Sequence, residues 1–253
     1  MFKLKKTITV KWLAESIGLD FNPSLAATEI HCVSALNSST KNSLTFSIHN
    51  EFSSDGMVIA PTLSDQKNVL YSNSPRYDFI KALSLINNEI GFTSCETEPD
   101  IHPTVVVGQN VVIENGVSIG KGTVIGHNVT ILKNTKIGIN CDIGPNSSLG
   151  VDGFGYERDE NGNPIKFIHL GGVCIGDNVQ IGANNTITRG ALGDSTIEDD
   201  VKTDNLVHVA HNCLIKQGAF LTAGAIFSGG VTFGKQAWIA PNSTVMQKLN
   251  IGD

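Results

Sequence analysis

The sequence predicts a mainly β protein, in which a parallel β-helix of hexapeptide repeats follows a small N-terminal α/β domain. Two observations lead to this fold class. From Ile101 onward an aliphatic residue returns at every sixth position, and the composition combines 26 glycines in 253 residues with only 6% aromatic residues. Frequent glycine and few aromatics are unusual for a mixed globular fold and are typical of repeat architectures.

The overall composition argues against several classes of function. The net charge is −6 and the 18 lysines and arginines are dispersed, which argues against nucleic-acid binding and favours small-molecule ligands. The 5 cysteines form no C-x-x-C pair, so reduced thiols are expected rather than a zinc or redox motif. No apolar run reaches the length of a signal-sequence core or of a membrane span. We therefore expect a cytoplasmic protein without an integral membrane segment.

Residues 1–98 are predicted to form the small α/β domain. Residues 9–17 have the pattern of a short helix, residues 28–33 that of a β-branched strand and residues 57–60 that of an apolar strand. A second helix is predicted before the repeats, because four apolar residues fall at helical spacing: Phe79, Leu83, Ile86 and Ile90.

Residues 99–253 carry the repeat. The series runs over residues 101–149, over 175–187 and, after a slip of four positions, over 197–251, where only Thr203 is polar. Glycine often follows the aliphatic residue and asparagine comes two positions later, and both residues favour turn conformations. A helix cannot keep positions i and i+6 on one face, so each hexapeptide is one short strand and corner. Three such walls close a triangular coil of about 18 residues, and stacked coils align their side chains in ladders.

One long interruption separates the first two series. Over residues 150–172 the period disappears and turn residues are frequent, which predicts an inserted loop that projects from the β-helix. Residues 189–194 form a second, smaller excursion. Long loops on rigid scaffolds often carry function.

His211 is the candidate catalytic base. It lies two positions after the repeating Val209, at an outward-facing corner, and one coil of about 18 residues later Gly229 falls directly over it. A histidine beside an exposed backbone N–H suits acyl transfer, because the imidazole takes the proton of an attacking amine and the N–H stabilises the oxyanion. Asp204 is a candidate to orient the imidazole or the amine.

Plainer interpretations of this histidine remain open. A histidine at a solvent-facing corner need not be catalytic, and His127 occupies the same position of its own repeat with no other distinguishing feature. A metal site is disfavoured, because His208 and His211 fall on different walls and no third ligand is evident.

Four runs carry a resemblance to a known family: residues 151–156 (Val-Asp-Gly-Phe-Gly-Tyr), 170–173 (Leu-Gly-Gly-Val), 187–192 (Ile-Thr-Arg-Gly-Ala-Leu) and 204–212 (Asp-Asn-Leu-Val-His-Val-Ala-His-Asn). In order and spacing they closely resemble the UDP-3-O-acylglucosamine N-acyltransferases of lipid A synthesis. The resemblance implies a left-handed, triangular β-helix and a homotrimer with sites in grooves between neighbouring subunits. It also implies that His211 is the catalytic base and that Gly229 is the oxyanion donor.

The same resemblance implies that the N-terminal domain binds uridine. Phe46 and Phe52 are expected to sandwich the base, although both rings would equally suit a hydrophobic core. His49 and Phe52 stand where the family usually has Asn and Tyr. We count His49 among the residues expected to bind the substrate.

Other residues are also predicted to belong to the site. Asn205 and His208 are expected to contact the substrate, and Arg189 and Lys248 the acyl donor. Thr188 stands where the family has Asp, and a second functional histidine of the family is replaced near Lys248. The sequence ends within a repeat, before the C-terminal helices with which the family engages acyl carrier protein.

The expected function is therefore transfer of a 3-hydroxyacyl chain from acyl carrier protein to the 2-amine of UDP-3-O-acylglucosamine. No bound cofactor or metal is expected, since the donor is a phosphopantetheine thioester of the carrier protein or an acyl-CoA. Basic residues would dock an acidic carrier protein, with five candidates: Arg189, Lys202, Lys216, Lys235 and Lys248. An alternative is an acetyl-CoA-dependent N-acetyltransferase that acts on a nucleotide-linked amino sugar for surface polysaccharide. A structural or ice-binding solenoid and a β-helix carbonic anhydrase are less favoured.

Overall fold

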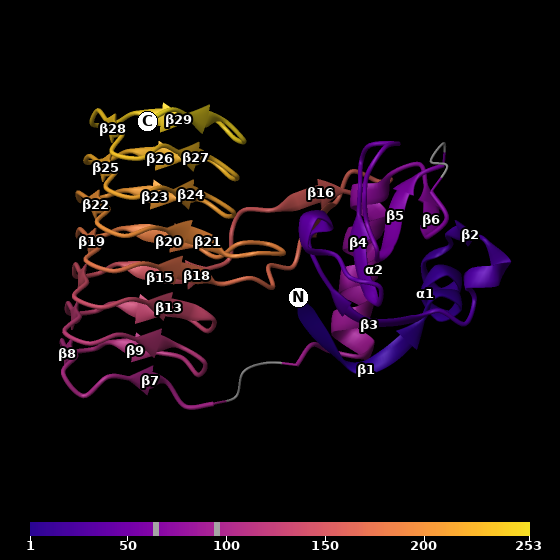
Figure 1. Cartoon of the computed structure of the whole chain (residues 1–253), viewed down its shortest axis with the longest axis horizontal. Helices are drawn as coiled ribbons and strands as arrows, with labels where there is room; N and C mark the ends of the chain where they lie inside the picture. Colours follow the sequence, from indigo (N-terminus) through magenta and orange to yellow (C-terminus); the bar gives the residue numbers. More distant parts are fainter. Residues whose placement is uncertain (63–65, 94–96) are drawn as a thin grey trace. The chain divides into compact units, whose positions relative to one another are not determined.

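The computed structural model describes residues 1–62, 66–93 and 97–253 (Figure 1). The chain forms two compact units. The N-terminal unit comprises Met1–Ser94 and Gly155–Ile168, and the β-helix unit comprises Cys95–Phe154 and His169–Asp253. The sequence assigns the whole insertion 150–172 to the C-terminal domain, whereas the structure groups its middle part with the N-terminal unit. None of the helices in the described ranges is long and apolar enough to cross a membrane.

The N-terminal unit is built on a six-stranded sheet in the order β1-β3-β4-β5-β6-β2. Its elements are β1 (Phe2–Thr9), α1 (Val10–Ile17), β2 (Asp20–Phe21), η1 (Pro23–Leu25), β3 (Glu29–Val33), η2 (Leu36–Ser38), β4 (Ser43–Phe46), β5 (Met57–Pro61), β6 (Val69–Ser72) and α2 (Pro75–Glu89). Strands β3 to β6 are parallel, and β1 and β2 pair antiparallel at the two edges. Both predicted helices and both predicted strands are present. Strand β1 is not evident from the sequence, because its exposed lysines hide the strand pattern.

Local sequence explains where the helices begin and end. The Thr9 side chain accepts a hydrogen bond from the Trp12 N–H at the start of α1, and Gly18 ends that helix in the left-handed conformation with φ 77°. Helix α2 begins at Pro75, whose missing N–H is no loss in a first turn. Its buried face, which includes Phe79 and Leu83, packs on β4 and β5.

The middle of the insertion forms a hairpin of β16 (Tyr156–Arg158) and β17 (Pro164–Lys166), which pair antiparallel. At its tip the Asp159 carboxylate accepts hydrogen bonds from the backbone N–H groups of Asn161 and Asn163, at 2.9 and 2.7 Å. These bonds stabilise the turn. The pKa of Asp159 lies below its usual range, first because Asn163 Nδ2 donates to the carboxylate at 3.0 Å and then because of the backbone N–H groups.

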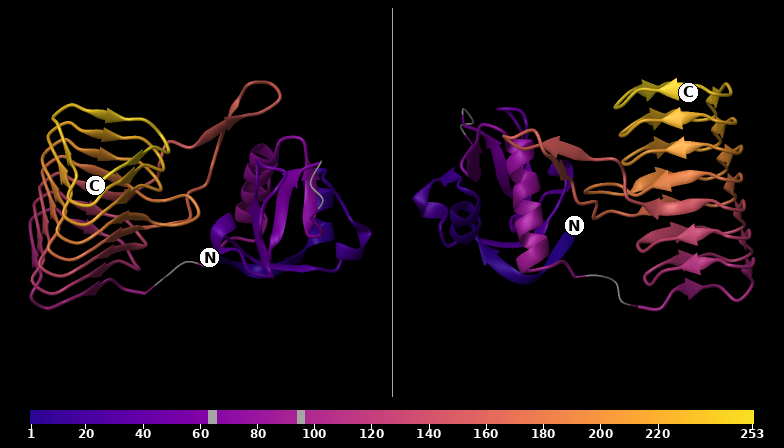
Figure 2. Two further views of the ribbon diagram at one scale, coloured as in Figure 1. Left: turned by 45° about the horizontal axis from the view of Figure 1, so that its top comes forward. Right: turned by 180° about the vertical axis from the view of Figure 1, so that it is seen from behind.

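The β-helix unit is a stack of triangular coils, and its three walls are three parallel sheets (Figure 2). Wall 1 contains β7 (Asp100–Ile101), β10 (Ser118–Ile119), β13 (Thr135–Ile137), β18 (Val173–Ile175), β21 (Ser195–Ile197), β24 (Leu214–Ile215), β27 (Thr232–Phe233) and β30 (Asn250–Ile251). Wall 2 contains β8 (Val106–Val107), β11 (Val124–Ile125), β14 (Asp142–Ile143), β19 (Gln180–Ile181), β22 (Lys202–Thr203), β25 (Phe220–Leu221) and β28 (Trp238–Ile239). Wall 3 contains β9 (Val112–Ile113), β12 (Thr130–Ile131), β15 (Ser148–Val151), β20 (Thr186–Thr188), β23 (His208–Val209), β26 (Ile226–Phe227) and β29 (Thr244–Val245).

The strand register confirms the predicted coil. Ile119 pairs with Ile101 on one side and with Ile137 on the other, so equivalent residues of successive coils lie side by side. The aliphatic ladders continue across the insertion, because Ile137 pairs with Ile175 and Leu149 pairs with Ile187. The register shifts only where the insertion begins, between Leu149 and Val151.

The core contains a second ladder that sequence analysis missed. The predicted aliphatic residues are buried, with Ile131, Ile187 and Val209 at 0% exposure. The residue two positions earlier also points inward, because side chains alternate along a strand. These positions hold small residues, for example Val129, Val207, Cys213, Ala219 and Ala225. The core of the β-helix unit is therefore two residues wide on each wall.

The four described cysteines are free thiols: Cys32, Cys141, Cys174 and Cys213. Burial raises the pKa of Cys213 to about 11, so this thiol stays protonated. Cys95 lies outside the described residues. For the four cysteines that the structure describes, the free thiols agree with the prediction of reduced cysteines.

Asparagines form the corners, as the sequence predicts. Asn110, Asn128 and Asn146 have φ of 56°, 58° and 60°, a left-handed conformation that asparagine tolerates better than other non-glycine residues. Their amides also form a ladder, in which Asn110 Nδ2 donates to Asn128 Oδ1 at 3.2 Å and Asn128 Nδ2 donates to Asn146 Oδ1 at 3.1 Å.

This arrangement predicts the effect of Asn128→Ala. The substitution removes two amide hydrogen bonds. It also places alanine in the left-handed conformation, which alanine tolerates less well than asparagine. We expect the free energy of unfolding to fall by about 1–2 kcal/mol in urea denaturation of the full chain. Asn128→Gly is the matched control. Glycine adopts the left-handed conformation without strain, so this variant should lose less free energy of unfolding. Equal losses for the two variants would show that the backbone conformation is not the reason.

Candidate active site

The corner after β23 carries His211, and its ring lies against Gly229 of the next coil. A methyl group at Gly229 would stand 2.7 Å from both Cε1 and Nε2 of His211 and 3.2 Å from Nδ1. These distances are shorter than van der Waals contact, so only glycine leaves room for the ring. The structure thus brings together the two residues that the coil count predicts to be neighbours.

Asn212 determines which ring nitrogen of His211 carries the hydrogen. The Ala191 N–H donates to Asn212 Oδ1 at 3.1 Å, which identifies that atom as the amide oxygen. The same oxygen lies 3.0 Å from His211 Nδ1. Since an amide oxygen only accepts, Nδ1 must carry the hydrogen, and Nε2 of the neutral ring keeps its lone pair. The imidazole is therefore held in the tautomer that a general base needs at Nε2.

His127 occupies the same position of its own hexapeptide, at a corner that follows wall 2 rather than wall 3, and has the opposite tautomer. Its Nδ1 accepts a hydrogen bond from the Gln109 N–H at 2.8 Å, so the hydrogen of the neutral ring is on Nε2. Nε2 of neutral His127 is thus a donor, whereas Nε2 of neutral His211 is an acceptor. This difference separates the two histidines, which the sequence alone leaves equivalent.

The backbone of Gly229 supplies the second group of the site. Its carbonyl accepts the Lys248 N–H at 3.0 Å, and the adjacent Gly230 N–H donates to the His211 carbonyl at 2.9 Å. No hydrogen bond joins the Gly229 N–H to another residue within the described ranges. An imidazole with a free Nε2 and an unpaired N–H on the facing glycine are the two groups required to accept a proton and to stabilise an oxyanion.

Asp204 and Asn205 have structural contacts at the preceding corner. The Asp204 carboxylate accepts the Asn205 N–H at 2.7 Å, and Asn205 Oδ1 accepts the Ala183 N–H at 2.7 Å. The residue that orients His211 is Asn212, which sequence analysis did not single out. The expectation that Asp204 orients the imidazole is therefore replaced by a role for Asn212.

Arg189 is buried, contrary to its predicted role at the donor site. Its side chain donates from Nε to the Gly150 carbonyl at 2.6 Å and lies 3.6 Å from the Asp152 carboxylate. Burial lowers the pKa of this guanidinium, while Asp152 and Glu114 act in the opposite direction. Arg189 thus anchors the start of the insertion, and with 4% exposure it presents no cation to a ligand in this chain.

The remaining predicted residues of this unit lie near the site. Lys248 is exposed, and its backbone contacts Gly229. His208 lies on the outer face of β23 between Thr186 and Ile226. Burial lowers the pKa of His208, which favours its neutral form.

The predicted aromatic sandwich in the N-terminal unit is not formed. Phe46 pairs in register with Ile59 and packs against Phe79 of α2, with ring centroids 4.7 Å apart. Phe52 instead packs on Val58 and its neighbours, on the opposite face of the sheet. Neighbouring residues on a strand point to opposite faces, so Phe46 and Phe52 cannot hold one planar ligand between them here.

Phe167 of the insertion completes the cluster around Phe46. Its ring lies 6.4 Å from that of Phe46 and 5.9 Å from that of Phe79, and the Arg76 guanidinium stands 5.5 Å above it. Arg76 also forms an ion pair with Glu157 at 3.0 Å. His49 is exposed, and its N–H donates to the Ser47 hydroxyl at 3.1 Å.

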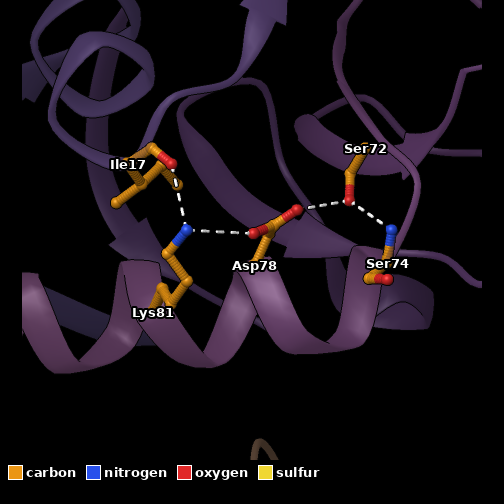
Figure 3. Close-up of polar contacts among 5 residues, drawn as sticks. All are labelled: Ile17, Ser72, Ser74, Asp78 and Lys81. Atoms are coloured by element: carbon orange, nitrogen blue, oxygen red, sulfur yellow. Dashed lines mark hydrogen bonds and ion pairs between the residues drawn. The ribbon is translucent and has the colours of Figure 1, made fainter. Parts of the chain in front are cut away.

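The N-terminal unit contains a cavity of about 710 Å³ at the start of α2. In this cavity Lys81 Nζ contacts the Ile17 carbonyl at 3.1 Å and Asp78 at 3.4 Å, as Figure 3 shows. The Ser72 hydroxyl donates to Asp78 at 2.6 Å and accepts the Ser74 N–H at 2.9 Å. These charged and polar groups satisfy one another. Within the described part of the chain, no cluster of three or more His, Cys, Asp or Glu side chains is arranged to hold a metal ion.

Comparison with known proteins identifies relatives of this chain. A UDP-3-O-acylglucosamine N-acyltransferase from Wolinella succinogenes is 38% identical over 102 residues, which are 40% of this chain and 32% of the relative. A protein of the same name from Chlorobium chlorochromatii is 50% identical over 82 residues, 32% of this chain and 23% of the relative. No protein-family model matches the chain. The matched part of this chain is thus similar to part of the UDP-3-O-acylglucosamine N-acyltransferases.

This relationship confirms the resemblance seen in the sequence, and the matches extend over about a third or less of the length of these relatives. Among solved structures, LpxA from Acinetobacter baumannii has a TM-score of 0.55 and 22% identity, and covers 61% of this chain and 58% of that one. This likeness concerns the fold. It agrees with the left-handed parallel β-helix expected for UDP-3-O-acylglucosamine N-acyltransferase relatives.

The tautomer assignment for His211 is directly testable. In long-range proton–nitrogen correlation spectra of histidine-labelled protein, we expect neutral His211 to carry its hydrogen on Nδ1. Neutral His127 should carry it on Nε2. Asn212→Ala, which removes the accepting oxygen, should change the His211 signals and leave those of His127 unchanged. A wild-type His211 with its hydrogen on Nε2 would contradict the assignment.

Proposed function

We propose that this chain is an N-acyltransferase that moves a 3-hydroxyacyl chain from acyl carrier protein to the 2-amine of UDP-3-O-acylglucosamine, in lipid A synthesis. The observation that carries the proposal is the pairing of His211 Nε2, available as a base, with the uncovered backbone of Gly229. The relatives are UDP-3-O-acylglucosamine N-acyltransferases by name, which supports N-acyl transfer to this acceptor.

In the proposed reaction the amine nitrogen attacks the thioester carbonyl and gives its proton to His211 Nε2. The Gly229 N–H donates to the oxygen that becomes negative in the tetrahedral intermediate. The new C–N bond stays, the C–S bond breaks, and the proton on His211 passes to the departing thiolate. Asn212 stabilises the imidazolium that forms between these steps, since its oxygen accepts the hydrogen on Nδ1.

The proposal includes the partners that the reaction requires. Lys248 lies beside Gly229 and would contact the phosphate groups of the donor, which is the phosphopantetheine thioester of acyl carrier protein. We propose no resident cofactor or metal. The N-terminal unit would hold the nucleotide, with His208 and Asn205 near the sugar. A homotrimer would place each His211 in a groove between subunits.

The His211→Ala variant tests the catalytic assignment. We expect turnover to fall by about 100- to 10,000-fold, the usual contribution of a general base, with an unchanged melting temperature. The matched control is His127→Ala, which removes a histidine from the same position of another hexapeptide and should keep full turnover. A His211→Ala variant as active as wild type would remove this residue from the mechanism.

The glycine tests the second half of the site. A methyl group at residue 229 must displace the imidazole, because it would stand 2.7 Å from Nε2. We expect Gly229→Ala to lower turnover by about 100-fold, as misplacement of a catalytic group by one ångström does. Gly218→Ala is a control for a glycine far from the site, although its positive φ will reduce stability.

A panel of donors and acceptors tests the substrate. We expect 3-hydroxyacyl carrier protein with UDP-3-O-acylglucosamine to give the highest kcat/KM. Preferred use of acetyl-CoA with another nucleotide-linked amino sugar would favour the alternative function in surface-polysaccharide synthesis. Absence of transfer with every pair, from protein that is folded, would contradict both.

A further inference from the structure

The imidazole of His211 has two further neighbours that the proposed reaction does not use. The ring of His169 meets that of His211 at a centroid distance of 5.3 Å and an interplanar angle of 68°. Gly153 lies against both, since a methyl group there would stand 2.7 Å from His211 Cδ2 and 2.8 Å from His169 Nε2. Both residues are buried, with His169 only 6% exposed.

These neighbours enclose the side of the ring that carries no nitrogen. Gly153 faces Cδ2 and Cβ of His211, whereas Gly229 faces Cε1, Nε2 and Nδ1. Asn212 binds Nδ1. The contacts thus leave Nε2, next to Gly229, as the nitrogen available for chemistry.

Ala191, in the excursion 189–194, binds both the chain after His169 and the amide that orients His211. Leu170 N–H donates to the Ala191 carbonyl at 2.8 Å, and Ala191 N–H in turn donates to Asn212 Oδ1. The residue after His169 and the amide that orients His211 are therefore bonded to the same residue, Ala191. A shift of His169 and a shift of Asn212 are coupled through it.

We infer that His169 is a positioning residue for His211, and that it holds the imidazole in the orientation in which Asn212 binds Nδ1. Gly153 lies against the Cδ2 side of the His211 ring and against His169, whereas Gly229 lies on the Nε2 side. A ring that tilted or moved into the space that His169 fills would lose the hydrogen bond between Nδ1 and Asn212 and would carry Nε2 away from Gly229. The packing of His169 prevents this movement, because a close-packed interior leaves little free volume.

The tautomer of His211 tests this inference without any assay of activity. In histidine-labelled full-length protein, we expect His169→Ala to replace the single Nδ1–H signature of His211 by an average of the two tautomers. His169→Phe keeps a flat, somewhat larger aromatic ring and should keep the single tautomer. His127 serves as the internal reference and should be unchanged in both variants.

Two results would overturn the inference. One is a His169→Ala variant that keeps the wild-type tautomer of His211. The other is a His169→Phe variant, folded by its melting temperature, that shows the averaged signature, since this would mean that the polar atoms of His169 act rather than its packing. Because His169→Phe keeps an aromatic ring against His211, its tautomer measurement decides the question even where His169→Ala fails to fold.

The kinetic consequence rests on the proposed function. If the chain transfers acyl groups as proposed, His169→Ala should lower kcat by about 10- to 100-fold, since a misplaced base loses much of its rate advantage. The KM for the amine acceptor should be unchanged, and His169→Phe should recover most of kcat. A chain that shows no transfer at all would refute the proposed function, and the tautomer result would still decide the role of His169.

Discussion

The site depends on the backbone hydrogen bonds that join successive coils in register. Ala210 N–H donates to the Phe227 carbonyl at 2.9 Å, and Gly230 N–H donates to the His211 carbonyl at 2.9 Å. These two bonds lie on either side of the contact between His211 and Gly229, so the imidazole cannot move along the stack without breaking the ladder. Rigid strands of this kind hold catalytic groups more accurately than loops do.

The features that follow the repeat could be predicted from the sequence, and those that depend on interruptions of the repeat could not. Gly229 is found by counting one coil from His211. Asn212 orients the imidazole only because Ala191, in the excursion 189–194, binds its oxygen. His169 follows the insertion, where no period exists to count. Burial of Arg189 likewise results from the insertion, since Gly150 and Asp152 at its start supply the partners.

The insertion contributes to the two units in different ways. Its hairpin brings Phe167 to the aromatic cluster of the N-terminal unit, where the ring is 4% exposed. Two positions later, His169 belongs to the β-helix unit and contacts His211. The sequence treats these residues as one projecting loop. The structure divides them between the two units. Phe167 packs in the N-terminal unit, because its burial removes a large apolar surface from water.

The polar residue in the aliphatic series has a structural reason close to the site. Thr203 Oγ1 accepts hydrogen bonds from the Gly182 N–H and from Asn185 Nδ2, at 3.0 and 2.6 Å, so this buried hydroxyl is satisfied. Asn185 also accepts the Val207 N–H and donates to the Asp204 carbonyl. The corner between them holds Leu206 at φ 61°, a conformation that costs a non-glycine residue about 1–2 kcal/mol. The buried amide offsets this strain and fixes the chain that enters β23. This explains why Thr203, on the wall before His211, and Asn185, in the preceding coil, replace apolar residues.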